Sequence, residues 1–340
     1  MTRWLAVLLA VQGCAAEPEV RQEGMLRGEG LGTTWIVRWA VEEGVSLSHV
    51  QDAVVGALTE VDAGMSTWRD DSELSAVRRG PGAVAVSEDT AFVTEEALRV
   101  AAATRGAFDP TVQPLMEAWG LHGGRKPAVP DEAELAAARA QVGWQRVRVS
   151  RGEGGHAQID AGGAALDLSA IAKGHAVDRV ALAVSALGVA DVFVEIGGEV
   201  RAHGTRPRGG VWTIGVEAPI EGAAQGDNVL GRLRVSNHAV ATSGNYRTTV
   251  RDGDRVIHHT MDPRTGAPAV NLVRSATVIA PDCRSADAWA TALMVLGPEG
   301  MAHIDARPEL EAWLLVEAED GELVGHESGG LRRFVVSSEL

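Results

Sequence analysis

The sequence predicts an α+β fold in which antiparallel sheets are combined with interposed helices. The first observation is a succession of short apolar segments separated by tight turns between residues 192 and 259, the pattern of an antiparallel sheet. The second is that segments with helical spacing of apolar residues are interposed between groups of these strands. Grouped strands with interposed helices are typical of α+β proteins.

The strands and helices of the first half follow from spacing and capping residues. Residues 35–41 are predicted to form a strand, and residues 47–61 an amphipathic helix whose apolar positions are Val50, Val54, Leu58 and Val61. Ser87 and Asp131 are predicted to cap helices over 88–104 and 132–140, and Gly106 ends the first of them. Residues 146–149 and 157–159 flank a glycine-rich segment and are predicted to form a hairpin.

The second half begins with a long helix over 170–187, for which Ser169 is the predicted cap. A buried strand at 192–196 ends at Gly197-Gly198. Five short strands are predicted at 212–216, 230–236, 239–242, 246–250 and 256–259. A strand at 275–280 precedes helices over 285–296 and 298–306, and terminal strands are expected near 313–316 and 334–336.

Composition limits the class of ligand. The chain has 340 residues, 45% of them hydrophobic, which is enough for a substantial buried core. Its formal net charge is −15 and it has no run of Lys or Arg, so its surface repels the phosphates of nucleic acid, which we exclude as a partner. A polyanionic ligand would need a local source of positive charge, such as a helix N-terminus, a few cations or a bound divalent metal.

The amino-terminal residues read as a targeting segment. Arg3 precedes a short apolar run over 4–11, too short to span a membrane, and Gly13-Cys14 follows as in a bacterial lipoprotein signal. We predict a signal peptide over 1–13, a lipidated Cys14 with a tether over 14–30, and one domain over 31–340. An ordinary cleaved signal with a spare cysteine is the alternative.

A lipid on Cys14 would anchor the protein on the periplasmic side of a bacterial membrane. Ala15, where Asp would retain a lipoprotein in the inner membrane, favours the outer membrane. With Cys14 acylated, only Cys283 remains, so no disulfide can form within the mature chain.

Asp287 and Thr291 are candidate metal ligands. They are four residues apart in a predicted helix and therefore lie on one face, where two oxygen atoms can converge on a hard cation. A polar stripe on a helix is the ordinary alternative. No Cys/His spacing typical of zinc or iron–sulfur sites is present.

His258 and His259 precede a turn shortly before that helix. Imidazole can accept a proton near neutral pH, and adjacent residues of a strand point to opposite faces, so at most one of the two faces a given site.

The segment from Asp167 to Lys173 places a carboxylate, a helix start and a cation within seven residues. Unpaired N–H groups at a helix N-terminus and the Lys173 charge would suit a phosphate or pyrophosphate. An ordinary Ser cap beside a solvated Lys is the alternative.

Trp68, beside small hydroxyl residues, offers a stacking face for a heteroaromatic ring, although packing explains most tryptophans. Gly197-Gly198 would let backbone approach a ligand closely.

These segments occur in an order that resembles the ApbE family of FAD:protein FMN transferases. The resemblance runs from Leu31 to about Gly297. The segments that carry it are residues 31–34 (Leu-Gly-Thr-Thr), 65–74, 108–112 (Phe-Asp-Pro-Thr-Val), 167–174, 194–199, 241–247, 259–266 and 287–291.

The resemblance implies an ApbE-like α+β fold and a defined reaction. FAD would be cleaved at its pyrophosphate, FMN would pass to a Ser or Thr hydroxyl of a target flavoprotein through a phosphoester bond, and AMP would leave. Mg2+ would be held by the side chains of Asp287 and Thr291 and by the backbone carbonyl of Ala170. His259 would accept the proton of the acceptor hydroxyl. The residues expected to contact FAD are Leu31, Trp68, Ala107, Phe108, Asp109, Asp167, Lys173 and Met261.

Three positions depart from the family pattern. Leu31 and Trp68 stand where Met and Tyr are common, and His175 stands where Tyr is expected after the Lys-Gly pair. Trp in place of Tyr keeps a stacking face but removes a phenolic hydroxyl.

Two other function classes stay open on the sequence. One is a magnesium-dependent FAD pyrophosphatase that releases FMN and AMP, and the other is a non-catalytic flavin-binding lipoprotein. For a transferase, a subunit of a redox-driven ion pump is a candidate target flavoprotein.

Overall fold

The computed structural model describes residues 21–340 except 123–125, 221–227, 246–248, 253–254, 259, 319 and 339–340. The predicted signal peptide, Cys14 and the proposed base His259 lie outside the described residues. Within the described part of the chain, no helix is long and apolar enough to cross a membrane.

The α+β prediction is confirmed, because the core is an eight-stranded antiparallel sheet covered by helices. Its strands follow in the spatial order β1 (Glu23–Gly30), β2 (Thr33–Ala40), β6 (Val192–Ile196), β7 (Glu199–His203), β10 (His238–Gly244), β15 (Val273–Ala280), β16 (Glu311–Glu317) and β17 (Leu323–Glu327).

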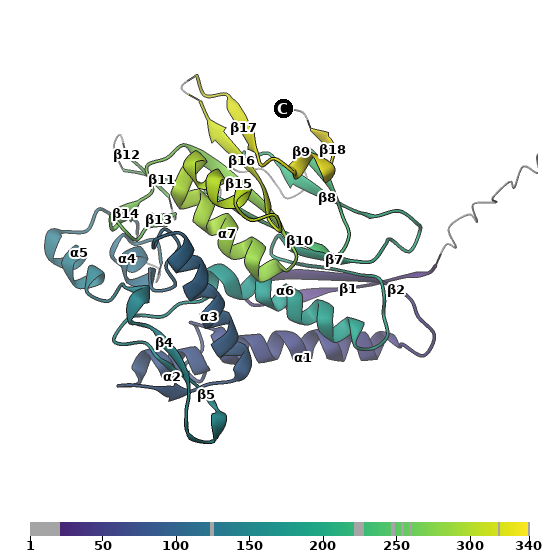
Figure 1. Cartoon of the computed structure of the whole chain (residues 1–340), viewed down its shortest axis with the longest axis horizontal. Coiled ribbons are helices and arrows are strands. Elements are labelled where there is room, and N and C mark those ends of the chain that lie inside the picture. The colour runs from purple at the N-terminus through teal and green to yellow at the C-terminus, as the bar shows by residue number, and fades with distance from the viewer. Residues whose placement is uncertain are drawn as a thin grey trace, which may run out of the picture.

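Long helices form a layer on one face of this sheet (Figure 1). These helices are α1 (Leu47–Met65), α3 (Glu88–Ala103), α6 (Ser169–Ser185) and α7 (Cys283–Leu296). Two predicted helix caps are confirmed. Ser87 caps α3 by accepting a hydrogen bond from the Thr90 amide, and Asp131 forms a capping box with Glu134 in the shorter helix α5 (Glu132–Arg139).

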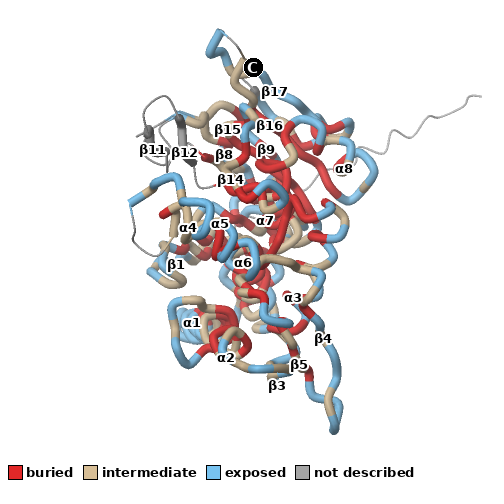
Figure 2. Tube along the Cα trace, turned by 90° about the vertical axis from the view of Figure 1, so that its left-hand side faces the viewer, coloured by how far each residue is buried: buried red, intermediate tan, exposed pale blue. Residues whose placement is uncertain are grey.

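A small sheet covers part of the opposite face. It consists of β18 (Val335–Ser338), β9 (Val229–Val235) and β8 (Trp212–Glu217), and Trp212 and Leu233 from it pack in one apolar cluster with Trp313 of the large sheet. Because layers cover both faces, the central strand β15 is buried along most of its length instead of alternating. Figure 2 shows this buried centre in red, with exposed segments around it.

The remaining elements surround this core. They are α2 (Glu73–Arg79), β3 (Val84–Ala85), α4 (Gln113–Ala118), β4 (Arg148–Arg151), β5 (Ala157–Asp160), β11 (Thr249–Asp252), β12 (Arg255–His258), β13 (Met261–Asp262), β14 (Ala267–Pro268) and α8 (Met301–Asp305). The strands β4 and β5 pair as the predicted hairpin.

One predicted boundary is wrong. Residues 23–30, assigned to the tether over 14–30, form the edge strand β1, which pairs along its whole length with β2. Its charges and glycines resemble a linker, but a side chain at Gly24 or Gly28 would overlap the rings of Trp39 or Trp35. The glycines therefore let two large aromatic side chains of β2 pack across β1.

The predicted role of Ser169 is also wrong. Ser169 is the first residue of α6. The N-cap of this helix is Leu168, whose side chain makes no capping hydrogen bond. Instead, Oδ1 of Asp167 accepts hydrogen bonds from the amide and the hydroxyl of Ser169, at 2.8 and 2.5 Å. The carboxylate two residues earlier thus fixes the start of the helix.

Candidate active site

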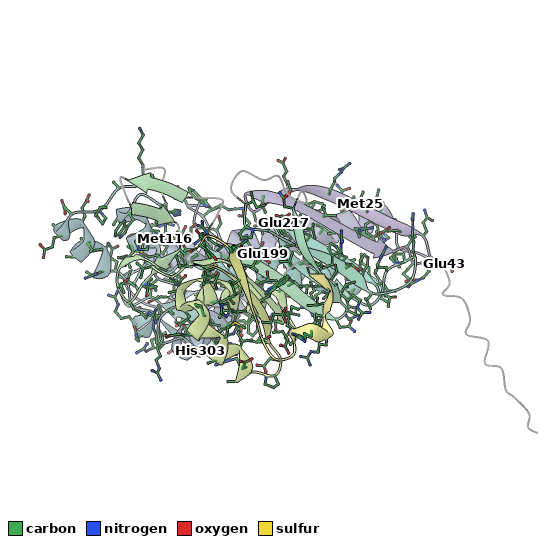
Figure 3. All side chains as sticks on the ribbon, turned by 90° about the horizontal axis from the view of Figure 1, so that it is seen from above. Met25, Glu43, Met116, Glu199, Glu217 and His303 are labelled. Carbon is green, nitrogen blue, oxygen red and sulfur yellow. The ribbon has the colours of Figure 1, made fainter. Side chains whose placement is uncertain are left out.

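A cavity of about 590 Å³ opens where the N-terminus of α6, the middle of α7 and the β6–β7 hairpin meet. Nine of the twelve predicted site residues line it: Ala107, Phe108, Asp109, Asp167, Ala170, Lys173, Met261, Asp287 and Thr291. Met116, Glu199 and Glu217, which also line the cavity, lie near one another in the middle of the molecule in Figure 3.

The close crossing of α6 and α7 brings Lys173 of α6 near the candidate metal ligand Asp287 of α7. A side chain at Gly174 would overlap the backbone carbonyl of Cys283, so glycine is required for the two helices to pack at this distance. The buried Asp178 of α6 accepts hydrogen bonds from the amides of Cys283 and Arg284 at the start of α7. These contacts fix Asp287 beside α6, where its Oδ2 accepts a hydrogen bond from the Gly174 amide at 2.9 Å.

The β6–β7 hairpin supplies a third charged group, Glu199. Ile196 pairs with Glu199 across a two-residue turn, Gly197-Gly198, whose φ angles of 63° and 106° favour glycine. The carboxylate of Glu195 stabilises the turn by accepting a hydrogen bond from the Gly198 amide at 2.7 Å. Gly197 and Gly198, where the sequence predicts a close approach of backbone to a ligand, both line the cavity.

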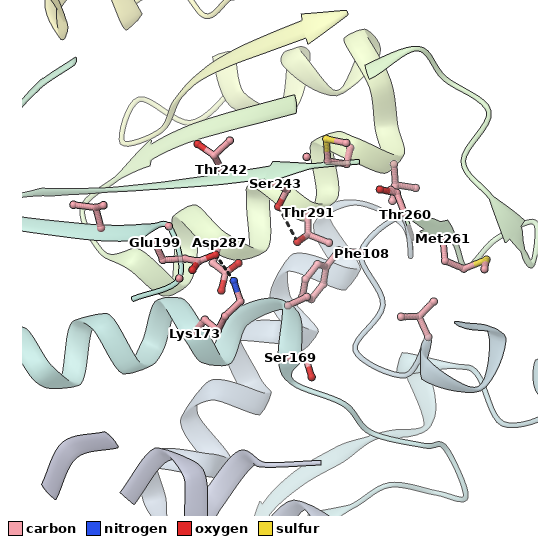
Figure 4. Close-up of a pocket in the computed structure, with 18 of the residues that line it drawn as sticks. Phe108, Ser169, Lys173, Glu199, Thr242, Ser243, Thr260, Met261, Asp287 and Thr291 are labelled. Carbon is pink, nitrogen blue, oxygen red and sulfur yellow. Dashed lines mark hydrogen bonds and ion pairs between the residues drawn. The ribbon is translucent and has the colours of Figure 1, made fainter. Parts of the chain in front are cut away.

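Lys173, Glu199 and Asp287 form a charged cluster in which both carboxyl groups are buried (Figure 4). The Lys173 ammonium group donates a hydrogen bond to Oε1 of Glu199 and forms an ion pair with it. The Glu199 side chain is 5% exposed, whereas that of Lys173 is 38% exposed. Oε2 of Glu199 is buried and has no hydrogen-bond partner among the described residues.

The charges of this cluster are not balanced. Burial raises the pKa of Asp287, against the opposing effect of Lys173, and burial raises the pKa of Glu199 to about 7. Burial acts to lower the pKa of Lys173, but the charges of Asp287 and Glu199 outweigh it and raise that pKa to about 12. When both carboxylates are ionised, the cluster has one more negative charge than positive, which a divalent cation would compensate.

The oxygen donors expected for Mg2+ lie at this end of the cavity. Asp287, Thr291 and Ala170 all line it, and the Thr291 hydroxyl lies 3.4 Å from that of Ser243. In the described part of the chain, no three His, Cys, Asp or Glu side chains cluster in a way that could hold a metal. A hydroxyl and a backbone carbonyl beside a single carboxylate fit a hard cation such as Mg2+, which keeps several waters, better than a soft metal.

The loop of Ala107, Phe108 and Asp109 forms another wall of the cavity. The Asp109 carboxylate is buried and accepts hydrogen bonds from the Thr111 amide and hydroxyl at 2.8 and 2.6 Å, so it shapes the loop. Burial raises its pKa, although the Thr111 hydrogen bonds oppose this effect. The Asp167 amide donates to the Pro110 carbonyl, which joins this loop to the start of α6.

Trp68 and Leu31 do not line this cavity. Trp68 is 80% exposed and lies at a second hollow, with its ring centroid 5.0 Å from that of His122. Gln113 and Glu117 line the second hollow, while Val112 and Met116 line the main cavity, so neighbouring faces of α4 border the two spaces. Leu31 lies in the β1–β2 turn with φ 53° and packs against the core.

His259 lies outside the described residues, so its predicted role stays a prediction. Its chain neighbours Thr260 and Met261 are both buried and both line the cavity.

The sequence did not identify Glu199 and Ser243 as site residues, although the cavity contains both. Glu199 directly follows Gly197-Gly198. A charged residue placed just after a buried strand and a Gly-Gly turn is the sequence signal that could have identified it.

Comparison with known proteins places these features in a family. The model of the ApbE family matches residues 31–314. The FAD:protein FMN transferase of Vibrio cholerae is 36% identical over 329 residues, which cover 94% of this chain and 96% of that protein. The FAD:protein FMN transferase of Salmonella typhimurium is 32% identical over 327 residues, with coverage of 93% and 92%.

Solved structures agree with this relationship. The flavin transferase ApbE from Vibrio cholerae superimposes with a TM-score of 0.81 at 36% identity and covers 92% of this chain and 99% of its own. The apo form of the Pseudomonas stutzeri flavinyl transferase ApbE gives a TM-score of 0.83 at 30% identity, with coverage of 93% and 98%.

Proposed function

This chain belongs to the ApbE family, and from that premise we propose that it is an FAD:protein FMN transferase. It would transfer FMN from FAD to a Ser or Thr hydroxyl of a target flavoprotein and release AMP. The observation that supports this most directly is the convergence of Lys173, Asp287 and the N-terminus of α6 on one cavity. Lys173 and the amides at the start of α6 are suited to a pyrophosphate, and Asp287 to a metal ion that would neutralise it, whereas the strongly acidic surface of the protein would repel it.

The reaction requires one bond to form and one to break. The acceptor hydroxyl oxygen bonds to the phosphorus of the FMN half, the bond from that phosphorus to the bridging oxygen breaks, and AMP leaves with that oxygen. The hydroxyl proton passes to His259, our proposed base. Lys173 would bind the phosphate oxygens, and the amides at the start of α6 would orient them.

We propose that Mg2+ is bound by the side chains of Asp287 and Thr291 and the backbone carbonyl of Ala170. When bound, the ion would neutralise charge on the pyrophosphate and polarise it. Support comes from the two carboxyl groups, Asp287 and Glu199, that act on the single ammonium group of Lys173, and from the oxygen donors that line the cavity.

FAD would extend from this cluster along the loop of Ala107, Phe108 and Asp109, and Met261 would contact it as well. Trp68 and Leu31 would contact parts of FAD that extend beyond the main cavity. Trp68 supports this proposal because its exposed ring lies at a hollow that adjoins the cavity across α4.

The cellular setting is a further part of the proposal. A lipid on Cys14 would anchor the enzyme on the periplasmic side of a bacterial membrane, with the outer membrane favoured. Its target would be a flavoprotein there, for which a subunit of a redox-driven ion pump is a candidate. Support comes from the signal-like sequence over 1–13 and the residue after Cys14.

The test uses purified protein, FAD, Mg2+ and a candidate target flavoprotein. The target should gain the mass of FMN less one water, as measured by intact mass spectrometry, and His259→Ala should abolish this gain. Undiminished transfer by His259→Ala would exclude His259 as the base. AMP release at the same rate without any target would instead identify a pyrophosphatase, and tight FAD binding without cleavage would identify a binding protein.

A further inference from the structure

Glu199 lies in the wall of the cavity but has no role in the proposed reaction. Its side chain is 5% exposed, in a cavity wall, and its position is fixed by the two-residue turn and by pairing of β7 with both β6 and β10. Glu195 adds a hydrogen bond to the same turn. The backbone of Glu199 is therefore held in place, and its side chain is enclosed by the cavity wall.

Lys173, in contrast to Glu199, has a long and flexible side chain. Its ammonium group is carried on a flexible four-carbon chain and can donate three hydrogen bonds, of which Glu199 accepts one. Asp287 is a second carboxylate whose charge acts on Lys173. Among the described residues, however, Lys173 forms its ion pair with Glu199, and Asp287 instead accepts a hydrogen bond from the Gly174 amide.

This choice of partner matters for the proposed metal site. An ammonium group paired with Asp287 would occupy the carboxylate on which a cation depends, because both compete for the same oxygen atoms. Glu199 offers Lys173 another carboxyl group, which is already desolvated. Its second oxygen, Oε2, has no partner in the described part of the chain and leaves this carboxylate free to accept a further donor.

We propose that Glu199 is a positioning residue that accepts the hydrogen bond of the Lys173 ammonium group in place of Asp287, and so leaves the Asp287 oxygens available to the cation. The inference rests on the proposed function for its relevance to catalysis. The competition between a lysine and a divalent cation for Asp287 exists whether or not FMN is transferred.

The test is a double-mutant cycle between Glu199→Ala and Lys173→Met. Mg2+ binding to the full-length protein without FAD is measured by calorimetry, and the Mg2+ concentration for half-maximal FMN transfer is measured in parallel. Glu199→Ala should weaken Mg2+ binding by roughly tenfold or more, the scale seen when residues that orient metal ligands are lost. Lys173→Met added to Glu199→Ala should restore binding, because the competing cation is gone.

Two further variants separate positioning from general destabilisation. Glu199→Gln retains an oxygen that can accept from Lys173, so it should restore most of the Mg2+ affinity lost in Glu199→Ala. Glu311→Ala removes another buried carboxylate, which is paired with Arg333 and does not line the cavity, and should leave Mg2+ affinity unchanged.

The inference is wrong if Glu199→Ala binds Mg2+ as the wild type does, or if the double variant binds it as weakly as Glu199→Ala. If Glu199→Ala does not fold, Glu199→Leu, which fills the space but also removes the acceptor, decides the matter with and without Lys173→Met by the same comparison. If the wild-type protein binds Mg2+ but never transfers FMN, the proposed function fails while the calorimetric cycle still tests Glu199.

Discussion

Asp287→Asn should stabilise the metal-free protein while removing magnesium-dependent transfer. Asp287 is buried, and burial raises its pKa because the ionised form is disfavoured there. Asn has nearly the same shape and retains an oxygen that can accept the hydrogen bond from the Gly174 amide. The substitution therefore removes a costly charge and preserves the contact between α6 and α7.

The magnitude follows from Glu199 as well. A rise in its pKa from 4.5 to about 7 corresponds to roughly 3 kcal/mol, mainly through burial, with Asp287 contributing a part. Asp287→Asn removes the repulsion between Asp287 and Glu199 and also the cost of burying the Asp287 charge. Together these two effects should raise the free energy of unfolding at pH 8 by roughly 1–2 kcal/mol, or the melting temperature by about 2 °C or more.

The sign of the pH dependence is fixed by these raised pKa values. A carboxyl group whose pKa is raised on folding contributes stability below its unfolded pKa, and this contribution is lost as the pH rises through its folded pKa. The advantage of Asp287→Asn should therefore be absent near pH 4 and grow toward pH 8.

The assay is thermal unfolding in EDTA at several pH values, together with FMN transfer in Mg2+. Transfer should fall at least roughly 100-fold, since metal stabilisation of the transition state amounts to several kcal/mol. Asp191→Asn is the control, because the pKa of Asp191 is lowered and Asp191 does not line the cavity. It should destabilise the protein at pH 8 and retain transfer. A lower melting temperature for Asp287→Asn in EDTA at pH 8 would show that the ionised Asp287 does not destabilise the folded protein.

Three substitutions test other parts of the structure. Trp68→Ala should raise the KM for FAD roughly tenfold through lost stacking but leave the melting temperature unchanged, because the ring is 80% exposed; an unchanged KM in steady-state kinetics would exclude Trp68 from FAD binding. Gly174→Ala should lower the melting temperature by several degrees, since its methyl group would overlap the Cys283 carbonyl, and equal stability would contradict the close helix crossing. Gly56→Ala, inside α1 with no atom within 4 Å of the added carbon, should increase the free energy of unfolding by roughly 0.5–1 kcal/mol in denaturant titration, and a loss would be the contrary result.

Local signals predicted most of the elements. Ser87 and Asp131 cap the helices expected from them, and the apolar spacing of Val50, Val54 and Leu58 predicts the buried face of α1. These predictions succeed because caps and helical periodicity depend on residues within a few positions of one another. The edge strand β1 was missed because its glycines are explained only by the tryptophans of β2, which the chain brings beside them.

Sequence patterns were sufficient to predict the fold class, and the ordered motifs indicated the chemistry of a cation, a carboxylate and a hydroxyl. The pairing of the charges, in contrast, depends on how the chain folds. Lys173, Glu199 and Asp287 come from a helix, a hairpin and a second helix far apart in the chain, and each could have remained solvated. Burial in one cavity makes their charges interact strongly, and no spacing along the chain encodes which carboxylate takes the lysine.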